Sequence, residues 1–503
     1  MKRNRILNQI RVFFITCLFV LLSSQVVIAA TYYIDYNVGN DSNNGTSIST
    51  PWKRCPGMPG FAGSYTHDDT NGDTFIFKGG VTWPYVSGGT ILTIQNNGVS
   101  AGKEDVYKGG QSLETPWGND YPVFDGGSHT ATIGGITTYS GTTPRSHIII
   151  EYLKLINIGN SVDGEGTAIA SNYGGSNINI RYNYLSPNCI DAFNYSPSRG
   201  AYQDLNIHHN IIRQTGRIAF DVGGTLTGFN FYNNTWEGGW DFSPSGTYHT
   251  DGIMFNGNGV TDYSIKNINI YNNHFWGDWI LGGTAMLYFS GATNGSQMVT
   301  QHTKIYNNVF SPSNSLGSGG SAASCILIKY GHDDVQIYNN TIDSRTVINL
   351  PSFGIIAFSS SGMTNTSNIT IKNNIILGFF RAITFGNLGG TNVIDNNSFY
   401  DNSRIYLHDP TGTAYTTCAQ AIAGGVMTVC TDTDPLFTTN ITAAGHGDVG
   451  YGLSNGDLSL QSGSPARDIG ADLSTFFTTD ILGNPRTSFN RNDITKVNIY
   501  RAL

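Results

Sequence analysis

One stretch of eight residues identifies the fold: Ile268-Asn269-Ile270-Tyr271-Asn272-Asn273-His274-Phe275. Apolar residues occupy its first, third and eighth positions, and an asparagine occupies the sixth. Alternation at period two predicts a β-strand before this asparagine, and the apolar residue two places later begins another strand across a tight bend. Asparagine suits such a bend because it tolerates the left-handed backbone region and hydrogen-bonds its own backbone.

The same pattern recurs along the chain. It occurs eight times, six of them with an Asn-Asn pair, at spacings of 27, 24, 39, 35, 32, 34 and 23 residues. The asparagines at the sixth position are Asn183, Asn210, Asn234, Asn273, Asn308, Asn340, Asn374 and Asn397. The shortest spacing fits one coil of three strands, the longer ones hold loops, and stacked asparagines can form a ladder. The repeat therefore predicts an all-β parallel β-helix, a single-stranded solenoid.

Each coil contains a second apolar strand between successive asparagine turns. These strands are expected at residues 189–193, 217–221, 251–255, 285–289, 325–329, 353–358 and 381–385. The longest loops, residues 237–250, 277–284 and 311–324, all enter this series. A parallel β-helix has no interior space to spare, so a functional site is expected on the outer face of these strands.

The N-terminus has the layout of a secretory signal peptide. Four cationic residues precede or border an apolar stretch at 12–22, which ends near Ala29-Ala30. We divide the chain into a signal peptide (1–30), an N-terminal cap with the first coils (31–144), the helix repeats (145–400) and a C-terminal cap region (401–503). We expect a secreted, extracellular or periplasmic monomer without a membrane span.

Charge and cysteine usage narrow the possible partners. The formal charge of the chain is −8, and the four cations of the signal leave −12 for the rest, which argues against a nucleic-acid partner. Aromatic and charged residues each make up 12% of the chain, a profile that suits an all-β extracellular protein with many turns. Cys418 and Cys430 are the best disulfide candidates, whereas Cys189 and Cys325 are expected to be small buried hydrophobes.

Residues 145–400 resemble the pectate-lyase-like superfamily of right-handed parallel β-helices. The resemblance extends to the ends of the chain: residues 32–46 and 72–80 are similar to the usual opening of such proteins, and residues 434–437, 458–470 and 480–486 to their C-terminal cap. Residues 493–496 depart from the usual end of that cap. The resemblance implies an asparagine ladder at the second turn and a polysaccharide ligand on an outer face.

Four charged residues are expected to share that outer face. Asp191, Asp221 and Asp251 lie on successive coils, which predicts either a calcium site or an acid/base cluster. Lys329 follows two coils later and is a candidate base for the C5 proton of a uronate. The alternatives are solvated aspartates at strand ends and a lysine that merely reaches into solvent.

One segment is similar to a motif of the polygalacturonase-like hydrolases. In Tyr248-His249-Thr250-Asp251-Gly252-Ile253, Asp251 stands at that family's catalytic acid and His249 replaces its asparagine, while Gly331-His332-Asp333 is similar to its Gly-His-Gly. The paired aspartate of the next coil is missing from residues 284–288, and the Arg-Ile-Lys element is not recognisable. His249 is therefore a candidate catalytic residue, or else a loop histidine that caps backbone.

Aromatic and polar residues near the same loops are candidates for sugar contact, because aromatic rings stack on the apolar faces of sugars. The tryptophans are Trp236, Trp240, Trp276 and Trp279. The other candidates are Arg217, Tyr248, Tyr288 and His332. For the tryptophans, packing between coil and loop is the alternative.

Three functions remain open. The leading hypothesis is a secreted polysaccharide lyase that acts by β-elimination on an acidic, uronate-containing polymer, with Lys329 or His249 as base and the three aspartates holding calcium. The second is a glycoside hydrolase that uses Asp221 and Asp251 as its carboxylate pair. The third is a non-catalytic carbohydrate-binding protein or adhesin.

Overall fold

The structure is a computed structural model, and its described part starts at residue 29, near the end of the segment interpreted as a signal peptide. It describes residues 29–86, 88–127, 133–159, 166–186, 191–195, 201–215, 218–240, 251–256, 264–280, 284–291, 298–312, 324–345, 353–439 and 458–479. Within these residues, no helix has the length and apolar character needed to cross a membrane.

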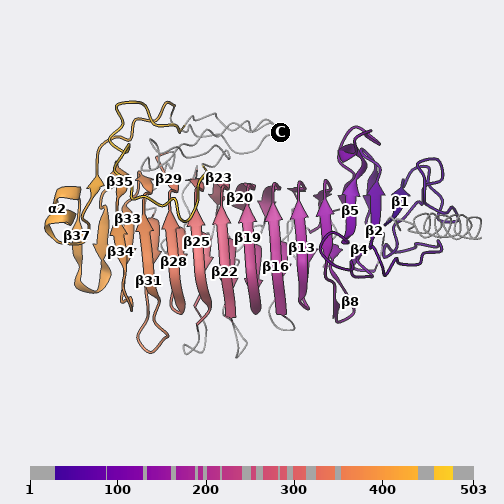
Figure 1. The fold of residues 1–503 in the computed structure, drawn as a ribbon, viewed down its shortest axis with the longest axis horizontal. Coiled ribbons are helices and arrows are strands. Elements are labelled where there is room, and N and C mark those ends of the chain that lie inside the picture. The colour runs from indigo at the N-terminus through magenta and orange to yellow at the C-terminus, as the bar shows by residue number, and fades with distance from the viewer. Residues whose placement is uncertain are drawn as a thin grey trace, which may run out of the picture.

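Three 12-stranded sheets run side by side along the molecule (Figure 1). Sheet A contains β1 (Ala30–Ile34), β2 (Asp73–Phe77), β5 (Asp105–Gly109), β10 (Ile148–Glu151), β13 (Gly175–Arg181), β16 (Ala201–His208), β19 (Thr225–Tyr232), β22 (Ser264–Tyr271), β25 (Thr300–Tyr306), β28 (His332–Tyr338), β31 (Ser367–Lys372) and β34 (Val393–Asp395). Sheet B contains β3 (Thr82–Pro84), β6 (Val123–Asp125), β11 (Lys154–Ile156), β14 (Tyr184–Ser186), β17 (Ile211–Thr215), β20 (Thr235–Trp240), β23 (His274–Ile280), β26 (Val309–Pro312), β29 (Thr341–Asp343), β32 (Ile375–Leu377), β35 (Asn397–Tyr400) and β38 (Cys430–Thr431). Sheet C contains β4 (Thr90–Thr93), β7 (Ile133–Thr137), β12 (Gly166–Ala170), β15 (Asp191–Tyr195), β18 (Ile218–Gly223), β21 (Asp251–Asn256), β24 (Ala285–Phe289), β27 (Ser324–Ile328), β30 (Phe353–Ala357), β33 (Arg381–Phe385), β36 (Tyr406–His408) and β37 (Thr413–Tyr415).

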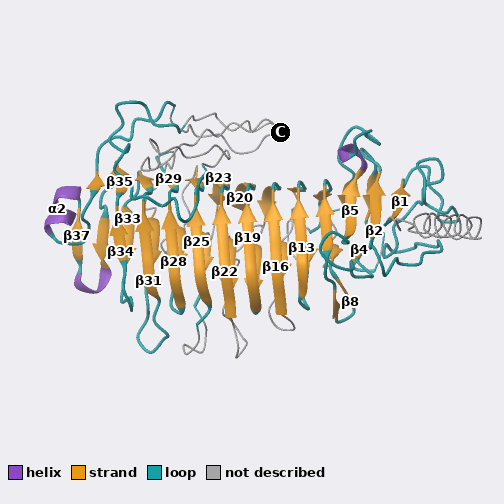
Figure 2. Cartoon of the chain, viewed as in Figure 1, coloured by secondary structure: helices purple, strands orange, loops and turns teal. Residues whose placement is uncertain are grey.

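The chain visits the three sheets in turn. It passes from β22 in sheet A to β23 in sheet B and β24 in sheet C, then returns to sheet A at β25, which pairs in parallel with β22. Helical structure in the described residues is limited to α2 (Cys418–Ala423) and the 3-10 turns η1 (Gly110–Ser112) and η2 (Asp409–Thr411), and β8 (Tyr139–Ser140) pairs with β9 (Thr143–Pro144) in a separate hairpin (Figure 2). The predicted right-handed parallel β-helix is confirmed.

The asparagine turn joins sheet A to sheet B. The side-chain Nδ2 of Asn273 donates to the carbonyl of Phe231 at 2.8 Å and to Oδ1 of Asn308 at 3.0 Å. Its own Oδ1 accepts the backbone N–H of Asn234 at 2.9 Å. Such contacts repeat from Asn183 to Asn397 and confirm the predicted ladder.

One detail of the turn differs from the sequence interpretation. The left-handed residue is the one before the ladder asparagine: Asn272 has φ of 55°, and His209 and Tyr182 hold the same position with φ of 57° and 56°. The two members of an Asn-Asn pair therefore have separate tasks. The first makes the bend. The second forms side-chain hydrogen bonds that join neighbouring coils.

Apolar side chains fill the interior of the coils. Aromatic rings stack from coil to coil, as in Phe275 on Phe310, whose centroids are 4.9 Å apart, and Phe255 on Phe289, at 4.7 Å. Each such fully buried side chain contributes roughly 1.5–3 kcal/mol to folding. Because the interior is filled, a functional site has to lie on an outer face.

The C-terminal segment lies along the asparagine turns. Asn396 donates from Nδ2 to the carbonyl of Ile469 at 2.7 Å, and Asn373 donates to the carbonyl of Ala471 at 2.8 Å. The ring of Phe477 stacks on Tyr306 with a centroid distance of 5.2 Å. The two hydrogen bonds are made by the bend asparagines, the first of each Asn-Asn pair. This part of the cap region therefore lies at the turn between sheets A and B.

A disulfide joins Cys418 to Cys430, as the sequence predicts, and Cys325 is a buried free thiol; Cys189 lies outside the described residues. We expect the double replacement of Cys418 and Cys430 by serine to destabilise the C-terminal end by up to about 3 kcal/mol, because it frees a loop of this length in the unfolded chain. Thermal unfolding with and without reductant checks this. Reductant should lower the Tm of the natural protein and leave that of the double variant unchanged; an equal shift in both would contradict it.

Candidate functional site

The outer face of sheet C carries side chains that do not belong to the interior. On β21, Ile253 and Phe255 pack into the core, while Met254 joins a separate cluster. The other buried members of that cluster are Ala285, Tyr288, Leu327, Phe353 and Ile356. Their strands are neighbours in sheet C, so the cluster runs along the helix axis. We call these six residues the outer apolar strip.

Asp251 lies at the start of β21, beside this strip. Its side chain is 1% exposed, and its Oδ1 accepts the backbone N–H of Ala285 on the next coil at 3.0 Å. Its Oδ2 is buried and has no hydrogen-bond partner among the described residues. Burial raises the pKa of Asp251 to about 7, although hydrogen bonds from Ala285 and Thr284 and the positive charge of Lys329 act in the opposite direction. A carboxyl group with this pKa can both accept and donate a proton near neutral pH.

Lys329 lies on the same face two coils further along. It follows the last residue of β27, and its backbone N–H donates to the carbonyl of Phe289 on β24 at 2.9 Å. Its Nζ lies 4.9 Å from the centroid of the Tyr288 ring, a cation–π contact. Lys329 and Tyr288 are therefore in contact on the outer face of sheet C, and the positive charge of Lys329 acts to lower the pKa of Asp251.

Three parallel sheets, wound one coil after another and joined at one edge by a buried asparagine ladder, define the architecture. The chain folds as a right-handed parallel β-helix. Asp251 and Lys329 lie on or next to strands of sheet C, whereas the ladder lies at the turn between sheets A and B.

Comparisons with solved structures find other β-helices of this kind. They include XylC in complex with xylose (10% identity, TM-score 0.46, 94% of this chain and 98% of that one). The pectate lyase Pel9A matches at 14% identity and a TM-score of 0.41, over 91% of this chain and 96% of that one. The GH136 lacto-N-biosidase from Eubacterium ramulus matches at 13% identity and a TM-score of 0.40, over 74% of this chain and 63% of that one. The chain thus spans less than two thirds of the lacto-N-biosidase, and likeness at these identities concerns the fold alone. Neither a protein-family model nor a curated relative matches the sequence.

Two of the predicted calcium ligands, Asp221 and Asp251, lie at different levels of sheet C. In the register of sheet C, Asp221 pairs with Asn194 and Met254, whereas Asp251 pairs with Ile218. Asp221 therefore lies three residues further along its strand than the level of Asp251. Asp191 is held locally instead, since the Nδ2 of Asn194 donates to its Oδ2 at 3.0 Å. All three are described, yet they are not among the metal-ligand groups that the described residues form.

Two predicted sugar contacts are wrong, because their side chains lie inside the coils. Trp236 is 0% exposed and packs beside Phe275, with ring centroids 5.8 Å apart. His332 begins β28 in sheet A, is also 0% exposed, and shares a hydrogen bond of 2.8 Å with the hydroxyl of Thr300. Burial lowers the pKa of His332 to about 3, so it is neutral in the folded protein.

The other predicted contacts divide into three groups. Tyr288 is on the outer apolar strip, so its role as a sugar contact stays a prediction. Trp276 is only 8% exposed and lies on β23 of sheet B, against His274, so it is not on the sheet C face. The remaining contacts lie outside what the structure describes, either as residues or as side chains: Arg217, Tyr248, Trp240 and Trp279. The candidate base His249 also lies outside the described residues.

Sequence reasoning missed a cationic and aromatic region at the far end of the same face. The guanidinium carbon of Arg381 lies 5.3 Å from the ring centroid of Phe353 and 5.5 Å from that of Phe380. The guanidinium carbon of Arg404 lies 5.4 Å from the Phe380 centroid. The available signal was Arg381 at the first position of an apolar strand, where an arginine is unusual.

Proposed function

We propose that the protein is a secreted enzyme that cleaves a uronate-containing polysaccharide by β-elimination on the outer face of sheet C. The observation that supports this most is the buried carboxyl of Asp251, with an oxygen that no described residue engages and a lysine nearby. A group of this kind suits proton abstraction at a site that also carries positive charge.

Each residue then has one role. Oδ2 of Asp251 takes the C5 proton of the uronate, the electron pair forms a C4–C5 double bond, the C4–O bond breaks, and the leaving oxygen takes a proton from solvent. The ammonium of Lys329 neutralises the uronate carboxylate, which makes the C5 proton more acidic. The ring of Tyr288 holds that ammonium in place through the cation–π contact. This assigns the base to Asp251 rather than to Lys329.

The remainder of the face suits an acidic polymer. Arg381 and Arg404 place two guanidinium groups along the helix axis beyond Lys329, and Phe353 and Phe380 present aromatic rings beside them. Guanidinium groups bind carboxylates through two parallel hydrogen bonds, and rings stack on sugar faces. Because the protein is acidic as a whole, these cations form a local exception to its charge.

We expect Arg381→Gln to raise KM for an acidic polymer by about tenfold or more while kcat changes little, because a charge-assisted contact to substrate is lost away from the reacting bond. The effect should shrink at high salt. Steady-state kinetics at two ionic strengths check this, with Lys372→Gln, at the end of β31 in sheet A, as the matched control. Equal changes in the two variants would contradict a binding role for Arg381.

A glycoside hydrolase is the second candidate. It is favoured by Asp221, a 9% exposed carboxyl on the strand next to that of Asp251. Inverting hydrolases use two carboxyls roughly 6.5–9.5 Å apart, one as general acid and one as general base, and Asp221 is the candidate partner of Asp251. In that reaction a water molecule is added across the cleaved glycosidic bond, so no C4–C5 double bond forms.

The test is incubation of the purified protein with pectate, alginate and glycosaminoglycans. β-Elimination predicts products with a new ultraviolet absorbance from the C4–C5 double bond, and Asp251→Asn should abolish them. Saturated reducing ends would instead identify the hydrolase. Binding to a polymer without release of products would contradict both and favour a carbohydrate-binding protein or adhesin. Asp333→Asn, which alters an acid on sheet A, is the matched control.

A further inference from the structure

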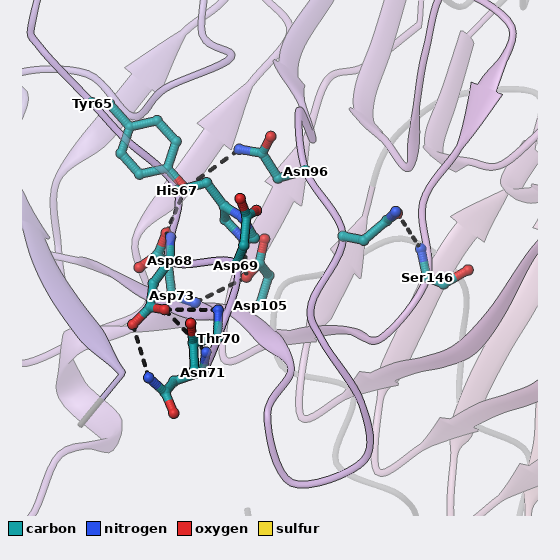
Figure 3. A network of polar contacts seen from close by, with 11 residues as sticks. Tyr65, His67, Asp68, Asp69, Thr70, Asn71, Asp73, Asn96, Asp105 and Ser146 are labelled. Carbon is teal, nitrogen blue, oxygen red and sulfur yellow. Dashed lines mark hydrogen bonds and ion pairs between the residues drawn. The ribbon is translucent and has the colours of Figure 1, made fainter. Parts of the chain in front are cut away.

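A second group of chemically active side chains lies at the N-terminal end of the helix, on sheet A rather than sheet C (Figure 3). Asp73 and Asp105 are the first residues of the neighbouring strands β2 and β5, and Thr74 and Val106, which follow them, are paired in register. His67 reaches them from the preceding loop. The three residues offer ligand atoms that all lie within 4.8 Å of one another.

Only one oxygen of each of the two carboxylates takes part in hydrogen bonds. Oδ1 of Asp105 accepts the backbone N–H of Asp73 at 2.9 Å and lies 3.0 Å from Nε2 of His67. Oδ2 of Asp73 accepts the hydroxyl of Tyr65 at 2.6 Å and the backbone N–H of Asp68 at 3.2 Å. The remaining oxygens, Oδ1 of Asp73 and Oδ2 of Asp105, are buried and have no hydrogen-bond partner among the described residues.

The negative charge of the two aspartates is also not balanced by a described lysine or arginine. Both aspartate side chains are 0% exposed, and within the described part of the chain no lysine or arginine lies within 4.0 Å of either carboxylate. Burying a carboxylate without a matching positive charge costs several kcal/mol, so such pairs are normally neutralised by a cationic side chain or a metal ion. A single histidine can neutralise one of the two carboxylates only.

We propose that His67, Asp73 and Asp105 bind one divalent cation of the transition series, such as Mn²⁺ or Zn²⁺. Nδ1 of His67 lies 2.8 Å from Oδ1 of Asp69, an arrangement in which the ring donates to a carboxylate and turns Nε2 toward a metal. Two ligands that each lie about 2.1 Å from one ion at right angles are about 3 Å apart, which matches Nε2 of His67 and Oδ1 of Asp105. The imidazole ligand favours a transition metal over calcium.

Such an ion has a structural task. It joins the loop that carries His67 to the first residues of β2 and β5, two of the first strands in sheet A. The ion fastens this loop to the sheet at the N-terminal end of the solenoid, where β1 is the edge strand. The site is separate from Asp251 and Lys329, so it does not depend on the proposed reaction.

The sequence contains a signal for the site that its analysis did not use. His67-Asp68-Asp69-Thr70-Asn71-Gly72-Asp73 combines a possible metal ligand with three carboxylates in seven residues. Asp68 shapes this loop, since its Oδ1 accepts the backbone N–H of Thr70 at 2.8 Å. The missing ligand, Asp105, is 32 residues after Asp73 and is identified only through the register of β2 and β5.

The test uses the full-length secreted chain after treatment with EDTA, titrated separately with Mn²⁺, Zn²⁺ and Ca²⁺ by calorimetry and followed by thermal unfolding. We expect one Mn²⁺ or Zn²⁺ per chain and a rise in Tm on binding, because an ion that binds only the folded state stabilises it. Asp105→Asn should abolish both effects, and Asp69→Asn should weaken binding by about tenfold to a hundredfold.

Asp333→Asn removes an acid elsewhere on sheet A and should bind as the natural protein does. If Asp105→Asn does not fold, His67→Gln is measured in its place, and X-ray absorption of the bound metal reports whether an imidazole nitrogen is a ligand. The proposal is overturned if no Mn²⁺ or Zn²⁺ binds, if only Ca²⁺ binds, or if binding persists unchanged in Asp105→Asn and His67→Gln.

Discussion

Asp251→Asn is expected to lower kcat on the polysaccharide substrate by about 10²–10⁴-fold, the usual contribution of a general base. An amide has the shape of the carboxyl but cannot take a proton. In the natural protein the rate should rise with pH through about 7, because the active form is the carboxylate. That limb should be absent from the residual activity of the variant. Initial rates between pH 5 and 9 check this (about two units on either side of the pKa).

The same substitution should not damage the fold. Because burial raises the pKa of Asp251 from 3.8 to about 7, the folded state binds its proton more tightly than the unfolded state. The stability from this group is therefore fully present below about pH 4 and is lost as pH rises toward 7, by an amount on the order of 4 kcal/mol. Asp251→Asn should remove this dependence and be at least as stable at pH 8. Loss of activity with loss of folding would contradict the catalytic role.

Asn273→Ala is expected to destabilise the helix by about 3–5 kcal/mol. The substitution removes the amide from the middle of the ladder and leaves the backbone N–H of Asn234 and the carbonyl of Phe231 without their partners. A buried unpaired polar group costs about 1–3 kcal/mol, and at least two are created here. Denaturant unfolding checks this.

Asn269→Ala is the matched control on the preceding strand. Asn269 is partly exposed and makes a single ladder-like bond, from its Nδ2 to Oδ1 of Asn230 at 3.0 Å. Its removal should cost less than about 1 kcal/mol, because water can replace an exposed partner. Equal losses in the two variants would show that asparagine stacking on the surface, rather than the buried ladder, holds the coils together.

The fold could be predicted because its signal is local and repeated. A strand at period two followed by Asn273 and Phe275 specifies the turn in each coil, and the structure has that turn at each copy from Asn183 to Asn397. The disulfide could also be predicted, since Cys418 and Cys430 are close in sequence. The only change concerns which asparagine of each pair adopts the left-handed backbone.

The site was harder to predict because it depends on register between coils. The sequence predicts Asp221 and Asp251 on successive coils of one outer face, but it does not give their register, and an offset of three residues separates their levels. Trp236 is a candidate because aromatic rings stack on sugars, and His332 because Gly331-His332-Asp333 is similar to the Gly-His-Gly of a hydrolase family. Both side chains are buried in the structure. Asp251 and Lys329 are candidates from the sequence because each is a charged residue next to an apolar run.

The most direct test of the account is a crystal structure of Asp251→Asn with an oligosaccharide of the polymer that the natural protein cleaves. The account predicts a chain of sugars along the outer face of sheet C. One uronate carboxylate should lie against Lys329 with its C5 facing residue 251, and a further one against Arg381. Sugar bound on the outer face of sheet A or sheet B, with none beside residue 251, would contradict it.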